Sequence, residues 1–298
     1  MYAKNDPRAA LNTASASPAA TEFVPASYGK FYETAPQEER DGGRFWYHRA
    51  QNFIVVYVEI SGEASLERSG QPDEWVVLVP DDGTLNVELR AGGDTKATRA
   101  ASMLVVPPGD SRMTARGQGR LTLLFTTRSP DLCAKCANAT EYAQAHPNIP
   151  PFVPWPDPPA GFALRLYPLN VPPEGGRFGC IYRCTTFMVN AFEVKPPRDV
   201  TALSPHLHED FEQCSLALDG AYIHHIRWPW VSDSTRWIDD HHEHCASPSV
   251  AIIPPPSLHT SQGISADGNR LFDIFSPPRR DFSEKPGWVL NAADYPMP

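Results

Sequence analysis

Four residues in the second half of the chain have the types and the spacing of a metal-binding set. His206 and His208 are two residues apart, Glu212 follows four residues after the second histidine, and His259 comes later, behind a proline-rich turn. On an extended strand, residues at i, i+2 and i+4 point to the same face. We therefore expect the first three side chains to face one way and His259 to join them from a separate strand.

Three imidazoles and one carboxylate suit a divalent transition metal that keeps open coordination positions. No cysteine lies in the motif, which argues against a closed structural zinc site. We expect one metal ion per chain, with Fe(II) favoured and Mn(II), Zn(II) or Ni(II) as alternatives. The open positions would let two substrate oxygens chelate, or let one substrate atom and O₂ bind side by side. The competing interpretation is that these are structural or surface histidines. A single histidine would favour it, whereas four residues of ligand type at these spacings favour a metal site.

These two stretches resemble the signature motifs of the cupin superfamily. The first reads His-x-His-x(3)-Glu and is followed by Gly220; the second reads Pro-x-Pro-x-x-His, with Pro256 at the place of the family's glycine. The resemblance covers roughly residues 50–280. It implies jelly-roll barrels and a metal held by His206, His208, Glu212 and His259.

An internal repeat indicates two such barrels. Residues 102–112 align without a gap with residues 249–259, and residues 120–125 align with residues 270–275. Together with the cupin resemblance, the repeat predicts an all-β bicupin made of tandem double-stranded β-helix (jelly-roll) barrels. The 32 prolines agree with this fold class, because proline interrupts helices and central strands.

The first copy of the repeat lacks the ligand types. With Glu74 aligned to Glu212, the positions of the three histidines hold Arg68, Gly70 and Arg112. Arginine does not lose its proton to bind a cation. We therefore expect the first barrel to be without a metal site.

The predicted organisation has five segments. They are an N-terminal arm (1–44), a first barrel (45–130), a proline-rich linker (131–160), a second, metal-binding barrel (161–280) and a C-terminal tail (281–298).

A dense polar group between the two ligand motifs supplies the catalytic candidates. Strand alternation puts one of His224 or His225 inward, where it could act as an acid or base or hold a substrate oxygen. Arg227 could pair with a substrate carboxylate or phenolate. Gln213 and Tyr222 are candidates for orienting the metal ligands.

Three further histidines, His241, His242 and His244, follow in the same region. They either reach the pocket or form an exposed polar hairpin.

Bulk properties narrow the class of partner. The formal net charge of -9 argues against nucleic-acid and membrane-surface partners. No apolar run approaches the roughly 18 residues of a membrane span. Residues 1–22 have no hydrophobic segment, which predicts an arm rather than a secretory signal. We expect a cytoplasmic protein with a small-molecule substrate that forms a homo-oligomer, a dimer or higher.

Fold alone does not choose the reaction. An Fe(II) dioxygenase acting on a hydroxylated aromatic or similar oxygen-chelating substrate fits one metal centre with Phe211, Tyr222, Trp228 and Trp230 nearby. The first alternative is a non-redox sugar-acid isomerase. It is suggested by a resemblance to the uronate isomerases, from whose pattern this chain departs by one residue in the spacing to the carboxylate. The second alternative is a metal-bound ligand sensor without catalysis.

Overall fold

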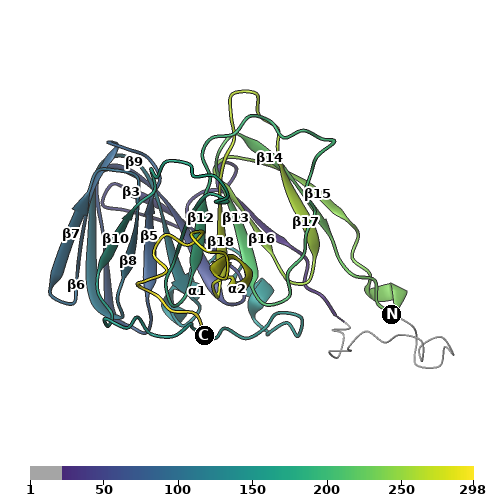
Figure 1. The fold of residues 1–298 in the computed structure, drawn as a ribbon, viewed down its shortest axis with the longest axis horizontal. Coiled ribbons are helices and arrows are strands. Elements are labelled where there is room, and N and C mark those ends of the chain that lie inside the picture. The colour runs from purple at the N-terminus through teal and green to yellow at the C-terminus, as the bar shows by residue number, and fades with distance from the viewer. Residues whose placement is uncertain (1–21) are drawn as a thin grey trace.

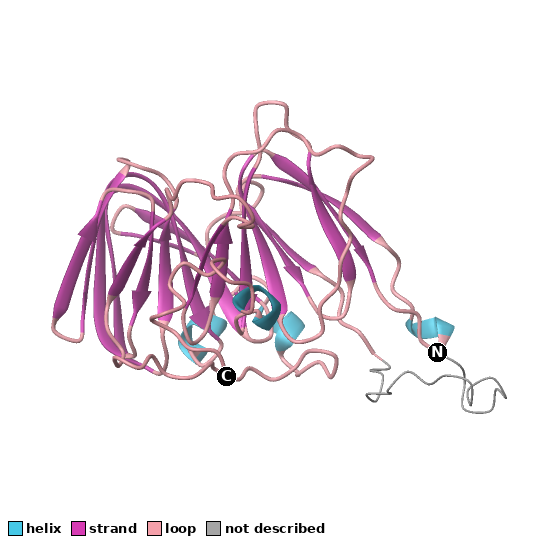
Figure 2. Ribbon diagram, viewed as in Figure 1, coloured by secondary structure: helices cyan, strands magenta, loops and turns pink. Residues whose placement is uncertain are grey.

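Two β-barrels packed side by side make up residues 22–298, which are the residues that the structure, a computed structural model, describes (Figure 1). Strands dominate the ribbon and the helices are short (Figure 2). The helices are α1 (Pro130–Cys133), α2 (Arg280–Ser283) and the 3-10 helices η2 (Ala139–Tyr142) and η3 (Ser234–Arg236). The predicted all-β fold of tandem jelly-roll barrels is confirmed. Within the described part of the chain, no helix is long and apolar enough to cross a membrane.

The first barrel is a nine-stranded antiparallel sheet. Its path is β10-β8-β5-β9-β4-β3-β2, and β6 and β7 branch from β9. The strands are β2 (Glu38–Arg40), β3 (Gly43–Arg49), β4 (Phe53–Gln71), β5 (Trp75–Val79), β6 (Leu85–Ala91), β7 (Asp94–Thr98), β8 (Ser102–Val106), β9 (Gly109–Thr126) and β10 (Arg165–Pro168). The long strands β4 and β9 pair along almost their whole length and so join both walls of the barrel.

The second barrel consists of two antiparallel sheets. One has six strands in the order β1-β16-β13-β18-β12-β11, and the other has three in the order β15-β14-β17. The strands are β1 (Ser27–Lys30), β11 (Cys180–Arg183), β12 (Met188–Ala191), β13 (Glu212–Asp219), β14 (Ala221–Arg227), β15 (His241–Ala246), β16 (Ser249–Ile253), β17 (Leu258–Gly263) and β18 (Arg270–Ser276).

The two barrels exchange strands. β1 precedes the first barrel in sequence but pairs with β16 of the second, with Ser27 opposite Ile252. β10 follows the first barrel and pairs with β8, with Arg165 opposite Val105. Because the repeat aligns β8 with β16, the two exchanges are equivalent.

The exchange changes the predicted segment limits. β1 lies in the segment predicted as an arm but belongs to the second barrel. β10 lies in the segment predicted as the second barrel but belongs to the first. Residues 1–21 of the predicted arm lie outside the described residues. In the predicted tail, Tyr295 is buried and contacts the first barrel through Glu74. These contacts are long-range, so local composition does not report them.

A shared apolar core joins the barrels. On β13, Cys214 and Leu216 point into this core, and on β5, Val76 and Leu78 do the same. Because strand side chains alternate, the residues between them point into the interior of their own barrel. Each large apolar side chain buried here contributes roughly 1.5–3 kcal/mol, so the two halves form one body.

The interiors of the two barrels differ in chemistry. The first is filled by an apolar cluster that includes Trp75, Val77 and Leu123. The repeat aligns these three residues with Gln213, Ser215 and Asp273, and the register agrees, because Val77 pairs with Leu123 as Ser215 pairs with Asp273. Buried polar groups are costly unless they are hydrogen-bonded. The second barrel therefore keeps a polar interior at positions where its sister has a packed core.

Glu74 and Glu212 fix the contact between the barrels in equivalent ways. Glu74 accepts hydrogen bonds from Thr185 N (2.9 Å), Thr185 Oγ1 (2.8 Å) and Tyr295 Oη (2.8 Å). Glu212 accepts them from the backbone amides of Gln51 (2.9 Å) and Asn52 (2.8 Å). Both glutamates are fully buried and each binds a turn of the opposite barrel.

Replacing Glu74 with Ala should lower the free energy of unfolding by about 3 kcal/mol, because three buried donors lose their acceptor. Urea denaturation measures the loss. Glu63→Ala is the matched control, since Glu63 pairs with Arg116 at the surface and an exposed pair contributes only about 0–1 kcal/mol. Equal losses in the two variants would contradict the role of Glu74.

His48 makes the docking of β1 sensitive to acid. Its ring is buried, Nε2 lies 3.0 Å from Ser27 Oγ, and burial lowers the pKa of His48 to about 4. Between pH 6.5 and 4 the unfolded chain therefore binds a proton that the folded chain does not, and stability falls as the pH falls. At pH 5 the loss is about 2 kcal/mol. Urea denaturation at pH 7 and pH 5 measures the free energy of unfolding, and the difference between the two pH values should be smaller in His48→Gln than in wild type. Equal differences in the two proteins would contradict this role of His48.

Candidate metal centre

The three predicted histidine ligands lie together in the second barrel. His206 and His259 exchange backbone hydrogen bonds of 3.0 and 2.9 Å, which form an isolated bridge. The His259 ring centroid lies 4.5 Å from that of His206 and 5.0 Å from that of His208. His208 and His259 are buried, and His206 is exposed. The sequence motif therefore identified three side chains that do meet.

Glu212 does not face them, and the expectation that it shares their face is wrong. Its carboxylate points to the opposite side of β13, where it binds the turn of the first barrel. The expectation assumed one continuous strand from His206 to Glu212. In the structure β13 begins only at Glu212, and residues 209–210 form a bend that shifts the alternation by one residue.

Gln213 takes the place expected for the carboxylate. Its Oε1 lies 3.2 Å from His208 Nε2 and 3.3 Å from His259 Nε2. The sequence already indicated that Gln213 takes this place, because the spacing from the histidines to Glu212 departs by one residue from that of the uronate isomerases. Counting to Gln213 instead of Glu212 removes the departure.

Asp273 and Ser215 orient the Gln213 amide. Gln213 Nε2 donates to Asp273 Oδ1 and to Ser215 Oγ, both at 3.2 Å, and Ser215 Oγ donates to the same Asp273 oxygen at 2.8 Å. A carboxylate only accepts hydrogen bonds, so the amide nitrogen must face Asp273. The amide oxygen is thereby directed at the histidines.

Backbone carbonyls fix the tautomers of two rings. His206 Nδ1 lies 3.0 Å from Ser204 O, and His259 Nδ1 lies 3.0 Å from Ser257 O. Because a carbonyl can only accept, each Nδ1 carries the proton and each Nε2 keeps its lone pair. This is the arrangement that metal-ligating histidines commonly have.

The donor set fits a cation. Burial lowers the pKa of His259 to about 4 and that of His208 to about 2, so both rings are neutral at pH 7. The lone pair of His259 Nε2 then faces the lone pairs of Gln213 Oε1, and two acceptors 3.3 Å apart are not a hydrogen bond. A metal ion between them would satisfy both.

Among residues 22–298 no three His, Cys, Asp or Glu side chains are already grouped as a metal site. The preformed donors are two histidines and an amide oxygen. The exposed ring of His206 would have to join them.

A pocket of about 430 Å³ opens onto this cluster. His206, Gln213, His259 and Asp273 line one part of it. The apolar wall is formed by Phe178, Phe192, Pro196, Pro197 and Leu271. Burial raises the pKa of Asp273, whose carboxylate is nevertheless reached from the pocket. The site thus combines nitrogen and oxygen donors, a carboxylate that can hold a proton, and an apolar surface.

None of the three catalytic candidates is among the residues that line this pocket. His224 points inward and is buried, with Nδ1 2.8 Å from Ser261 Oγ, and burial lowers its pKa to about 3. His225 points to the outer face of the sheet, where its Nδ1 lies 2.7 Å from that of His242. The catalytic assignment of His225 therefore conflicts with its position.

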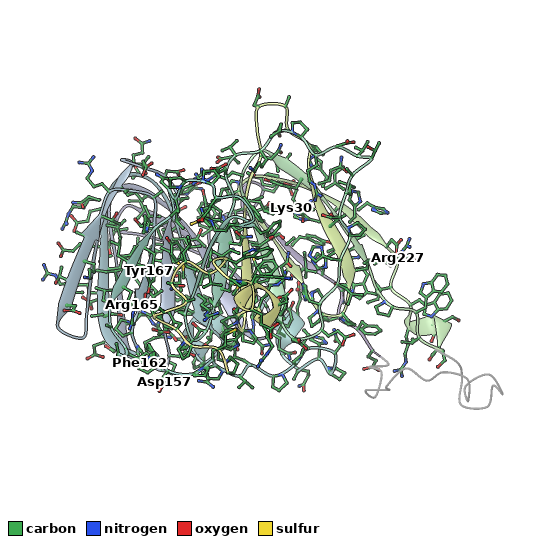
Figure 3. All side chains as sticks on the ribbon, viewed as in Figure 1. Lys30, Asp157, Phe162, Arg165, Tyr167 and Arg227 are labelled. Carbon is green, nitrogen blue, oxygen red and sulfur yellow. The ribbon has the colours of Figure 1, made fainter. Side chains whose placement is uncertain are left out.

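Arg227 is also outside the pocket. It forms a salt bridge with Asp240 and its side chain is 65% exposed. Figure 3 shows it on the side of the second barrel that faces away from the first. Strand alternation accounts for this, because Arg227 follows His225 at i+2 and shares its face.

The remaining histidines divide by the same rule. His241 lies on the inner face, with Nδ1 3.0 Å from the Tyr28 hydroxyl. His242 and His244 are exposed. Tyr222, predicted to orient ligands, lines the pocket.

Sequence reasoning missed Asp273. The repeat could have identified it, because Asp273 aligns with the inward-facing Leu123. Burying a charged residue is costly, so a carboxylate at such a position indicates a functional role.

Comparisons with known proteins support the fold. A scan against protein families gave no match, and neither did a search of curated protein sequences. Among solved structures, the chain is similar to AerE from Microcystis aeruginosa, with 12% identity, a TM-score of 0.54, and coverage of 81% of this chain and 95% of that one. It is similar to the oxalate decarboxylase of Lactobacillus farciminis in a formate complex, with 16% identity, a TM-score of 0.55, and coverage of 85% and 86%.

A third similar structure is YlbA from E. coli, with 12% identity, a TM-score of 0.51, and coverage of 88% of this chain and 96% of that one. The chain has the fold of the cupin superfamily. At these identities the similarity establishes the arrangement of a bicupin and leaves the chemistry to be argued from the residues of this chain.

Proposed function

We propose that the second cupin barrel binds one divalent transition metal ion through Nε2 of His206, His208 and His259 and through Oε1 of Gln213. The observation that carries this proposal is the unprotonated Nε2 of His259, which faces Gln213 Oε1 at 3.3 Å while a backbone carbonyl holds its Nδ1 proton. The first barrel has Trp75 and a packed apolar interior at the equivalent positions. Its predicted lack of a metal site stays a prediction.

We further propose that the protein is an oxygen-dependent enzyme acting on a hydroxylated aromatic. The four donors are uncharged, so a divalent ion would keep its charge and attract an anionic, oxygen-chelating substrate. When bound, Fe(II) would supply the redox chemistry that activation of O₂ requires. The apolar wall, with Phe178 and Phe192, offers contacts for a ring.

Asp273 supplies the proton chemistry of this proposal. Its Oδ1 accepts bonds from Gln213 and Ser215, whereas no described residue donates a hydrogen bond to its Oδ2. Because burial raises its pKa, the carboxylate can take the proton that a phenolic hydroxyl loses on binding. The same carboxylate could move a proton between neighbouring carbons of a sugar acid, which keeps a non-redox isomerase as the second candidate.

Gln213→Ala and His259→Ala should each reduce metal affinity at least about 10-fold, because each removes a preformed donor. Glu212→Gln should keep the metal and lose stability, since Glu212 binds only the opposite barrel. Elemental analysis of anaerobically loaded protein, with Mn(II) titration by calorimetry, measures both. Loss of metal in folded Glu212→Gln, with retention in Gln213→Ala, would reverse the assignment.

Protein loaded with about one Fe(II) per chain should consume O₂ with a catechol, a hydroquinone or gentisate. The uptake should disappear in Gln213→Ala. An oxygen electrode records the reaction, with metal-free protein as the control. Iron-loaded protein that takes up no O₂ across the panel but converts a uronate anaerobically would favour the isomerase. Binding without turnover of any of these would indicate a sensor.

A further inference from the structure

Arg198 lies in the pocket wall next to the proposed metal ligands. Its Nη1 donates to Thr260 Oγ1 at 3.3 Å and to Ser261 O at 3.0 Å, and its Nη2 donates to Ser204 Oγ at 3.0 Å. Ser204 is two residues before His206, and Thr260 directly follows His259. The guanidinium is therefore held between the two segments that carry these histidines.

All three bonds go to neutral oxygens, and no carboxylate of residues 22–298 forms a salt bridge with Arg198. Its Nε–H and its second Nη2–H have no partner among the described residues. Other arginines of this chain use that Nε/Nη2 edge to hold a carboxylate: Arg116 binds Glu63, Arg227 binds Asp240 and Arg279 binds Asp281. In Arg198 the Nε–H of this edge holds no carboxylate and has no hydrogen-bond partner among the described residues.

The charges around the pocket leave room for an anion. Lys195 pairs with Glu193 at 3.5 Å, and Asp273 is engaged by Gln213 and Ser215. The four charged side chains that line the pocket, Glu193, Lys195, Arg198 and Asp273, sum to zero. A divalent metal would make the sum positive, which would favour an anionic substrate.

We propose that Arg198 determines substrate specificity by binding a carboxylate of the substrate through its Nε/Nη2 edge, while the other oxygens of the substrate face the histidines and Gln213. A planar guanidinium holds a carboxylate with two parallel hydrogen bonds. The pocket volume of about 430 Å³ admits a ring that carries such a group. The placement of the other substrate oxygens at the metal ligands rests on the proposed function, whereas the carboxylate site at Arg198 does not.

The test compares 2-hydroxybenzoate with 2-hydroxybenzamide, which has the same shape without the negative charge. Calorimetry with metal-free and with Mn(II)-loaded protein should show that wild type binds the acid at least about 10-fold more tightly than the amide. Arg198→Met should lose at least about 10-fold in affinity for the acid and keep its affinity for the amide. Arg198→Lys should recover only part of the loss, because it restores the charge without the fork.

Arg227→Met is the matched control, since Arg227 is a surface arginine of the same barrel and should change neither affinity. Circular dichroism and thermal melts confirm that each variant is folded. Equal affinity of wild type for acid and amide, no effect of Arg198→Met, or no measurable binding of 2-hydroxybenzoate to wild type would each overturn the proposal.

Metal uptake, measured on the same samples, separates this proposal from the proposed function. Preference for the acid that depends on Arg198, in protein that takes up no metal, would leave the carboxylate site standing and reject the metal enzyme. If Arg198→Met takes up metal normally and its preference for the acid over the amide is unchanged, the carboxylate site is rejected and the metal site stands.

Discussion

The alternation of side chains along β13 is the constraint on which the site depends. Glu212, Cys214 and Leu216 face the other barrel, and Gln213 and Ser215 face the interior of their own barrel, where Ser215 Oγ bonds the Gln213 amide. The apolar residues of this strand are locked in the shared core, so its phase cannot slip by one residue without exposing them and burying polar groups there. Packing between the barrels thus decides that an amide, and not the adjacent carboxylate, reaches the histidines.

The first barrel supplies stability through its packed interior, and the second barrel holds the polar site. A polar interior weakens a barrel, because each buried donor and acceptor must find a partner and no apolar side chains fill the centre. The first barrel contributes a filled interior around Trp75 and half of the shared core. The second can then keep Gln213, Ser215 and Asp273 at the equivalent positions.

Much of the fold could be predicted from the sequence, because the repeat and the histidine spacing are local patterns. The same patterns located His206, His208 and His259. The sequence placed Glu212, His225 and Arg227 in the site, whereas in the structure they face away from it. The bend at residues 209–210 decides the face of Glu212, and the phase of β14 decides the face of His225 and Arg227. A phase is set by packing against distant residues, which spacing alone does not report. The strand exchange was missed for the same reason.

That exchange has a consequence for how the molecule can be divided. The second barrel takes β1 from the sequence that precedes the first barrel, and the first barrel takes β10 from beyond the connection between the two, so neither half of the chain is a self-contained unit. A cut in the connection between the barrels would release two fragments, each of which has an unpaired sheet edge and holds a strand that the other needs. Such fragments should recover their structure only as a complementing pair. Removing the residues up to Lys30 would strip a strand and Tyr28 from the barrel encoded at the opposite end of the chain.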